Sequence, residues 1–266
     1  MCSPSLRHII TNSTERLSSS DQALLGNIFN AYESTCIVAR NTSLENFPAV
    51  QYTSIHEFAN ELSTEFVVCI AYLKLIPEFN NLIMDDKLRL IRNHIGTIVH
   101  IHESIMHPTV SSNLVATWTN IFSLDITERL LKRRQIIEQY IIDPVLLRVI
   151  LIILVLSSSN CRNIAHINMN LICDDSLAIF KAQNFYVELL WRYIVSRSSS
   201  DRTAVKFLNR LMLYILFAEN LHLHIDDYVD SLRDEVKQME PLMQSMWPRA
   251  IDEDIVYIQI AKDIIL

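Results

Sequence analysis

Residues 74–92 read KLIPEFNNLIMDDKLRLIR, and this stretch decides how the chain folds. The apolar residues before it recur every three or four positions, which predicts one long amphipathic helix from Ser54. Pro77 ends that helix, because proline and the residue before it disfavour further α conformation. Asp85 and Asp86 begin the next helix, since acidic side chains in a first turn interact favourably with the helix N-terminus. The stretch is therefore predicted to be a corner between two long helices.

Outward from this corner, the same spacing predicts helices throughout and no strand. The predicted helices cover residues 22–35, 54–76, 85–107, 128–140, 145–156, 174–196 and 201–233. Ser18 to Asp21 form a capping cluster, and Asp201 is the expected N-cap of the last long helix. Gly26 and Gly96 are the only glycines, although hairpins and phosphate-binding loops both depend on glycine. We expect an all-α fold of stacked helical layers.

The composition excludes several classes of protein. The net charge is -7, so the chain lacks the basic surface of a nucleic-acid-binding protein, and no direct nucleic-acid contact is expected. The five cysteines include no CxxC pair, which indicates reduced thiols rather than a zinc module or a disulfide framework. The N-terminus has no signal-peptide pattern, and the longest apolar run, 145–156, is shorter than the ~20 residues of a membrane span. We therefore expect no membrane contact.

Residues 74–92 resemble the signature of nuclear-receptor ligand-binding domains, Lys-x-x-Pro-x-Phe-x-x-Leu-x-x-x-Asp-Gln-hydrophobic-x-Leu-Leu-Lys, with every spacing kept. The departures are Lys87 for glutamine, Ile91 for leucine and Arg92 for lysine. Residues 17–25 resemble the first helix of the vitamin D, farnesoid X, liver X and ecdysone receptor group. Residues 240–247, EPLMQSMW, resemble that group's activation helix.

The resemblance implies a three-layer antiparallel helical sandwich over residues 17–247, between a flexible N-terminus, 1–16, and a C-terminal extension, 248–266. It also implies a nuclear, and partly cytoplasmic, transcription regulator that binds a small lipophilic ligand and recruits co-activator or co-repressor helical peptides. The chain has neither a Gly-x-Ser-x-Gly elbow nor a glycine-rich phosphate loop, so we expect no enzyme activity, no catalytic residue and no cofactor.

The resemblance assigns a co-regulator groove to both ends of the signature and to the activation helix. Lys74 and Arg92 match its positive positions, and the alternative is that both lie on a solvated helix surface. Leu242, Met243, Ser245 and Met246 are the groove residues of the activation helix. Ser245 stands where the family has glutamate, so it supplies no charge to the amide end of the peptide. The loss should weaken peptide binding by about 1–3 kcal/mol.

A ligand pocket is expected beside the long helix before Pro77. Its predicted residues are Leu62, Glu65, Phe66, Cys69, His102, His222 and Trp247. The apolar members are core residues first, and Glu65 and His102 are expected either to pair with each other or to be ordinary interior polar groups. The histidines near His102 suggest no metal site, because positions i and i+2 diverge on a helix.

A second function remains open: a ligand-independent scaffold, or a repressive dimer partner lacking its own DNA-binding module, with the pocket filled by side chains. The family dimerises through its long penultimate helix, which here begins at Asp201 and ends at Arg233. The apolar stripe of that helix serves the core alone, or both the core and a homo- or heterodimer partner. Its members are Phe207, Leu211, Tyr214, Ile215 and Ala218. The tail, 248–266, is expected either to cover the groove or to be poorly ordered.

Overall fold

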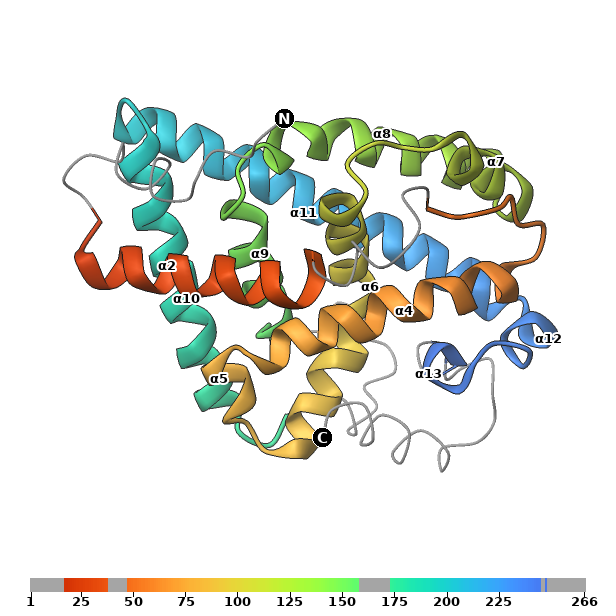
Figure 1. Cartoon of the computed structure of the whole chain (residues 1–266), viewed down its shortest axis with the longest axis horizontal. Helices are drawn as coiled ribbons and strands as arrows, with labels where there is room; N and C mark the ends of the chain where they lie inside the picture. The colour runs from red at the N-terminus through yellow and green to blue at the C-terminus, as the bar shows by residue number, and fades with distance from the viewer. Residues whose placement is uncertain (1–16, 38–46, 158–172, 245–246, 248–266) are drawn as a thin grey trace.

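The computed structural model describes residues 17–37, 47–157, 173–244 and Trp247 (Figure 1). These residues form helices joined by turns, and no strand occurs among them, which confirms the all-α class. Ser245, Met246 and the predicted terminal segments, 1–16 and 248–266, lie outside the described residues. The predictions for these positions therefore stay predictions.

The long predicted helices are present within a few residues of their expected bounds. In chain order the helices are α2 (Ser19–Tyr32), the π-helix η1 (Glu33–Ile37), α4 (Ile55–Lys74), α5 (Pro77–Asn80), α6 (Met84–Met106), α7 (Ser112–Ile121), α8 (Leu124–Ile141), α9 (Leu146–Val155), α10 (Ser176–Arg197), α11 (Asp201–Asp230), α12 (Arg233–Val236) and α13 (Pro241–Gln244). No helix in this described part of the chain is long and apolar enough to cross a membrane.

The corner predicted from residues 74–92 is present. Helix α4 ends at Lys74, Pro77 begins α5, and α6 begins at Met84 with Asp85 and Asp86 in its first turn. Asp86 is fully buried, and its carboxylate accepts backbone N–H bonds from Asp174 (2.7 Å) and Asp175 (3.0 Å). The acidic residue that starts α6 therefore also fixes the start of α10.

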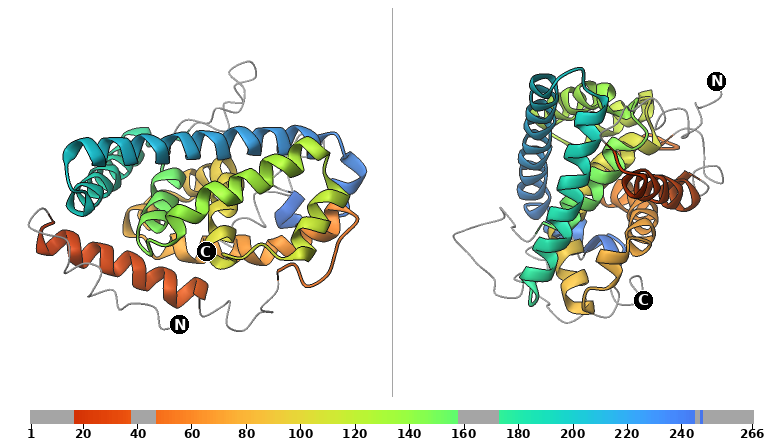
Figure 2. Two further views of the ribbon diagram at one scale, coloured as in Figure 1. Left: turned by 90° about the horizontal axis from the view of Figure 1, so that it is seen from above. Right: turned by 90° about the vertical axis from the view of Figure 1, so that its left-hand side faces the viewer.

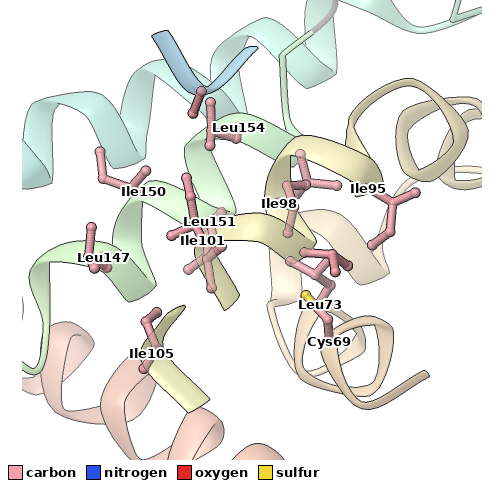
Figure 3. Packing of buried hydrophobic residues seen from close by; sticks show 14 of the residues in the cluster. Cys69, Leu73, Ile95, Ile98, Ile101, Ile105, Leu147, Ile150, Leu151 and Leu154 are labelled. Carbon is pink, nitrogen blue, oxygen red and sulfur yellow. The ribbon is translucent and has the colours of Figure 1, made fainter. Parts of the chain in front are cut away.

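Helices α6 and α9 form the middle of the molecule. All ten residues of α9 are buried. Nine of them are apolar, as expected for a core helix, and the tenth, Arg148, pairs with Glu33 of η1. Ile98 and Ile101 of α6 pack near Leu151 of α9, and Cys69 and Leu73 of α4 complete this part of the core (Figure 3). Figure 2 shows α11 along one side of the molecule and α2 along the other, with α6 and α9 between them.

Two details near helix ends test the capping predictions. Ser18 is the N-cap of α2 and forms a reciprocal capping box with Asp21, as the serine cluster predicts. The prediction for α11 is wrong, because Ser200 is the N-cap and Asp201 is already the first helical residue. Helix α11 also ends at Asp230, so the expected helix to Arg233 is divided into α11 and α12.

The apolar stripe predicted on the long penultimate helix faces the core. Leu211, Tyr214, Ile215 and Ala218 are buried, and Phe207 is partly buried against them. A different set of apolar side chains is exposed on α11, namely Val205, Met212, Leu213 and Leu216. Any partner of α11 would therefore contact this second set.

Candidate functional site

A cavity of about 70 Å³ lies among α4, α6, α7, α8 and α11. Most of its wall is apolar, including Phe58, Leu62 and Phe66 of α4 and Trp118 of α7. Pockets for small molecules usually enclose about 300–1,000 Å³. In this conformation the cavity is therefore too small for a sterol, and a bulky occupant would require the wall to move.

The polar end of the cavity is formed by α6 and α11. Gly96, His100 and Glu103 lie on one face of α6, and His222 approaches them from α11. A Cβ atom built on Gly96 would lie 2.0 Å from His222 Nε2. Glycine in the middle of a helix costs about 1 kcal/mol relative to alanine, so its presence in α6 is explained by the close approach of this ring.

Two imidazoles meet at this polar end. The rings of His100 and His222 are 5.6 Å apart and nearly perpendicular, at 76°. Burial, the positive charge of Arg133 and the neighbouring His222 lower the pKa of His100 well below its usual value. His100 is therefore uncharged at neutral pH, when its ring can both donate and accept a hydrogen bond.

Behind this face lies a buried charged cluster of Glu103, Arg133 and Arg134, all at most 4% exposed. Arg133 Nη2 lies 3.3 Å from Glu103 Oε2, and Arg134 Nη2 lies 3.9 Å from Oε1. Within the described residues, Glu103 Oε1 and the Nε and Nη1 atoms of both arginines have no hydrogen-bond partner. One carboxylate thus faces two guanidinium groups, and several buried polar atoms are left unsatisfied.

The C-terminal part of the described chain also contributes to the cavity wall. Met243 of α13 and Trp247 both line it. The indole Nε1 of Trp247 donates a 3.1 Å hydrogen bond to Asp226 Oδ1, which lies 3.4 Å from His222 Nε2. Polar contacts therefore connect His222, whose ring packs against Gly96, through Asp226 to Trp247.

Helices α12 and α13 are attached to the N-terminal half of α4. Glu240, just before α13, accepts a hydrogen bond from Ser63 (2.9 Å), and its backbone N–H donates to Asn60 Oδ1 (2.6 Å). Glu235 of α12 lies 2.6 Å from His56 Nδ1, and this hydrogen bond lowers the pKa of the Glu235 carboxyl. The segment that contributes to the cavity wall is thus held by polar contacts to α4.

A second buried polar cluster joins α2, α4 and α6. Tyr32 Oη lies 2.9 Å from His102 Nδ1, and the two oxygens of Glu65 lie 3.3 Å from His102 Nε2 and 3.2 Å from His107 Nε2. Burial raises the pKa of Glu65, but hydrogen bonds and charge from the two histidines outweigh it and lower the pKa to about 2. The predicted contact between Glu65 and His102 is present.

The structure places the predicted pocket residues in three different parts of the molecule. Four of them line the cavity: Leu62, Phe66, His222 and Trp247. Glu65 and His102 lie in the second polar cluster, and Cys69 lies in the apolar core shown in Figure 3. None of these three is part of the cavity wall.

Among the cavity residues that sequence reasoning missed are Gly96, His100 and Glu103. Their spacing of four and three residues was the available signal, because it places them on one face of a helix. Within the described ranges, no group of three or more His, Cys, Asp or Glu side chains is placed to hold a metal ion.

The predicted groove residues that the structure describes lie on three different helices. Three of them are half-buried: Lys74 at the C-terminal end of α4, Arg92 within α6 and Leu242 on α13. Met243 is fully buried and lines the cavity, so α13 presents it inward in this conformation, and its assignment to the groove stays a prediction. Ser245 and Met246 are among the residues left undescribed.

Comparison of the chain with protein-family models finds no match, and comparison with curated proteins finds none either. The function is therefore inferred from the residues around the cavity.

Proposed function

We propose that this chain is a ligand-regulated domain of nuclear-receptor type, in which a small lipophilic molecule in the cavity controls a surface for co-regulator peptides. The observation that carries this proposal is the position of Met243 and Trp247. Both line the cavity, and both belong to the stretch that resembles an activation helix. A molecule in the cavity would touch both, so it would favour some positions of α13 over others.

The mechanism is a shift between populations of α13 positions. A ligand changes such an equilibrium only by its difference in affinity for the two states, and direct contact with α13 provides this difference. Ser63, which binds the start of α13, and Lys74 are separated by about 16 Å along α4, at about 1.5 Å per residue. This length suits a short peptide helix of about three turns lying between Lys74 and α13.

The remaining features of the proposal rest on the resemblance and on the arrangement of the helices. The position of α6 and α9 between α11 and α2 supports a three-layer antiparallel helical sandwich over residues 17–247 (Figure 2). Dimerisation would use the exposed apolar residues of α11, of which Leu213 is 66% and Leu216 60% exposed. The proposed partners are co-activator or co-repressor peptides, and the proposed location is the nucleus.

One observation favours a second function, the ligand-independent scaffold. The cavity of about 70 Å³ is smaller than the ~150 Å³ of an engineered apolar cavity that binds benzene. In this second function the chain would bind its partners through α13 and α11 without any small molecule.

Native mass spectrometry of the purified protein, followed by a thermal-shift screen against lipophilic molecules, separates the two functions. Ala59 lines the cavity on α4, so Ala59→Leu should fill it. Ala23 is exposed on α2, which makes Ala23→Leu a control of equal size change. Ligand regulation predicts an adduct or a thermal shift in the wild type and in Ala23→Leu, but not in Ala59→Leu. No adduct and no shift in any of the three proteins would favour the scaffold.

A further inference from the structure

We infer that α11 binds α11 of a second copy of this chain in antiparallel orientation, about a two-fold axis that passes midway between Leu213 and Leu216. The inference deepens the proposed function and rests on it, because it names the partner of the surface that α11 contributes to that function. Its basis is a row of exposed side chains that is symmetric along the helix and complementary to itself.

The row lies on the outer face of α11. On a helix with 3.6 residues per turn its members fall within about 60° of one another, opposite the side that carries the buried residues of α11. Helix α11 itself runs along one side of the molecule (Figure 2). All members of the row are exposed, and in chain order they are Arg202, Asn209, Leu213, Leu216, Asn220 and Asp227.

The order of side chains in the row is a palindrome. Its two leucines are the innermost members, with Asn209 four residues before the first and Asn220 four residues after the second. Arg202 lies eleven residues before the first leucine, and Asp227 lies eleven residues after the second. Only these outermost members differ in kind, and they carry opposite charges. A two-fold interface has this requirement, because residue i of one copy contacts residue j of the other and j contacts i.

Antiparallel packing places each member against a suitable partner. The leucines, 66% and 60% exposed in the single chain, would be buried together at the axis. Asn209 would face Asn220 of the second copy, and an amide can both donate and accept a hydrogen bond. Arg202 would face Asp227 of the second copy at each end. Asp227 also has an interaction within its own chain, and a carboxylate can accept several hydrogen bonds at once.

Charge selects the orientation and the partner. Parallel packing in the same register would place Arg202 against Arg202 and Asp227 against Asp227, which are repulsive contacts. The antiparallel arrangement converts both into attractive contacts. The symmetry of the row therefore favours a second copy of this chain over a partner of different sequence, which would have to carry the complementary row by itself.

Sedimentation velocity of the purified protein without added ligand tests whether the dimer exists. Because the row is a small interface, the wild type should show a concentration-dependent monomer–dimer equilibrium in the micromolar range. Leu213→Glu should abolish the dimer, since it places a charge of each copy beside the axis. Leu124 is 72% exposed on α8, and Leu124→Glu is the matched control that should dimerise like the wild type. Both positions are exposed, so both variants should fold, which circular dichroism checks.

Two charge reversals test the antiparallel register. Arg202→Asp and Asp227→Arg should each raise the dimer dissociation constant roughly ten-fold, because two attractive contacts become repulsive. An equimolar mixture of the two variants should dimerise like the wild type, since each contact between positions 202 and 227 again joins opposite charges. The double variant Arg202→Asp/Asp227→Arg should do the same on its own.

The outcomes separate this inference from ligand regulation. A wild type that is monomeric at every concentration, or that Leu213→Glu does not weaken, would overturn the dimer. Single charge variants that dimerise like the wild type, or a mixture that fails to recover, would overturn the antiparallel register. Neither result bears on the cavity. Conversely, absence of any adduct or thermal shift would overturn ligand regulation and leave a wild-type dimer in place.

Discussion

Glu65 and Glu103 are both buried carboxylates, and their surroundings differ in one respect. Each oxygen of Glu65 faces an imidazole, at 3.3 and 3.2 Å. Glu103 has one oxygen bound to Arg133 and one without a hydrogen-bond partner among the described residues, beside a cavity. Each carboxylate has one oxygen without a hydrogen-bond partner among the described residues, Glu65 Oε2 and Glu103 Oε1. The two clusters differ in their cations, because Glu65 faces imidazoles and Glu103 faces guanidinium groups. The stability that each carboxylate contributes should therefore depend on its cations, because a guanidinium group keeps its charge whereas an imidazole can exist uncharged.

The largest expected difference between the two regions is the effect of neutralising each carboxylate. Glu103→Gln should lower the free energy of unfolding by about 3–5 kcal/mol, because it leaves two buried guanidinium groups that keep their charge. Glu65→Gln should cost only about 1–3 kcal/mol, because an imidazole can exist uncharged near neutral pH. Urea unfolding at pH 7 measures both. Glu138 is exposed on α8, so Glu138→Gln should change stability by less than about 0.5 kcal/mol. Equal costs for the two buried carboxylates would contradict the comparison.

The Glu65 cluster should also make the free energy of unfolding depend on pH below about pH 5. The pKa of Glu65 is about 2 in the folded protein against 4.5 for an ordinary glutamate, so the ionised form stabilises the fold. That contribution, on the order of 3 kcal/mol, is present above about pH 4.5 and is lost as the pH falls toward 2. Urea unfolding between pH 5 and 2 should therefore show a steeper loss for the wild type than for Glu65→Gln. Parallel pH profiles of the unfolding free energy in the two proteins would show that ionised Glu65 does not stabilise the fold.

Gly96 tests how tightly the polar end of the cavity is packed. Gly96→Ala should destabilise the protein by about 1–3 kcal/mol, since the new Cβ would meet the His222 ring. Adding His222→Ala should recover part of this loss. Gly26, half-buried in α2, is the matched control, and Gly26→Ala should stabilise by up to about 1 kcal/mol, as alanine normally does in a helix. Thermal or urea unfolding gives both values. A stabilising Gly96→Ala would mean that His222 does not occupy this position.

The smallest expected effect concerns the link from α11 to the C-terminal segment. Trp247→Phe removes the indole N–H that donates to Asp226 while keeping an aromatic ring against the cavity. We expect a loss of about 1 kcal/mol in urea unfolding, together with faster amide exchange in α13. Trp191→Phe, at a partly buried tryptophan of α10, should leave exchange in α13 unchanged. Unchanged exchange in Trp247→Phe would show that this bond does not hold the segment.

Local signals in the sequence predicted the helices and the corner, because proline, acidic first turns and apolar spacing act over a few residues. Four of the seven predicted pocket residues line the cavity, and two of these, Leu62 and Phe66, follow from the periodicity of α4. The role of Gly96 was not predictable, because it depends on which side chain of α11 packs opposite it. Likewise, Glu65 and Glu103 look alike in sequence, and only the packing of α8 against α6 surrounds one of them with arginines.

Amide hydrogen exchange in α13, with and without a bound cavity ligand, tests the central claim most directly. The relevant amides are those of Gln244 and Trp247, which donate to Glu240 and Gln244. If occupancy of the cavity controls this segment, a saturating ligand should slow their exchange in the wild type and leave it unchanged in Ala59→Leu. Protection confined to α4 and α6, with no change at Gln244 and Trp247, would contradict the claim that the cavity and the C-terminal segment act together.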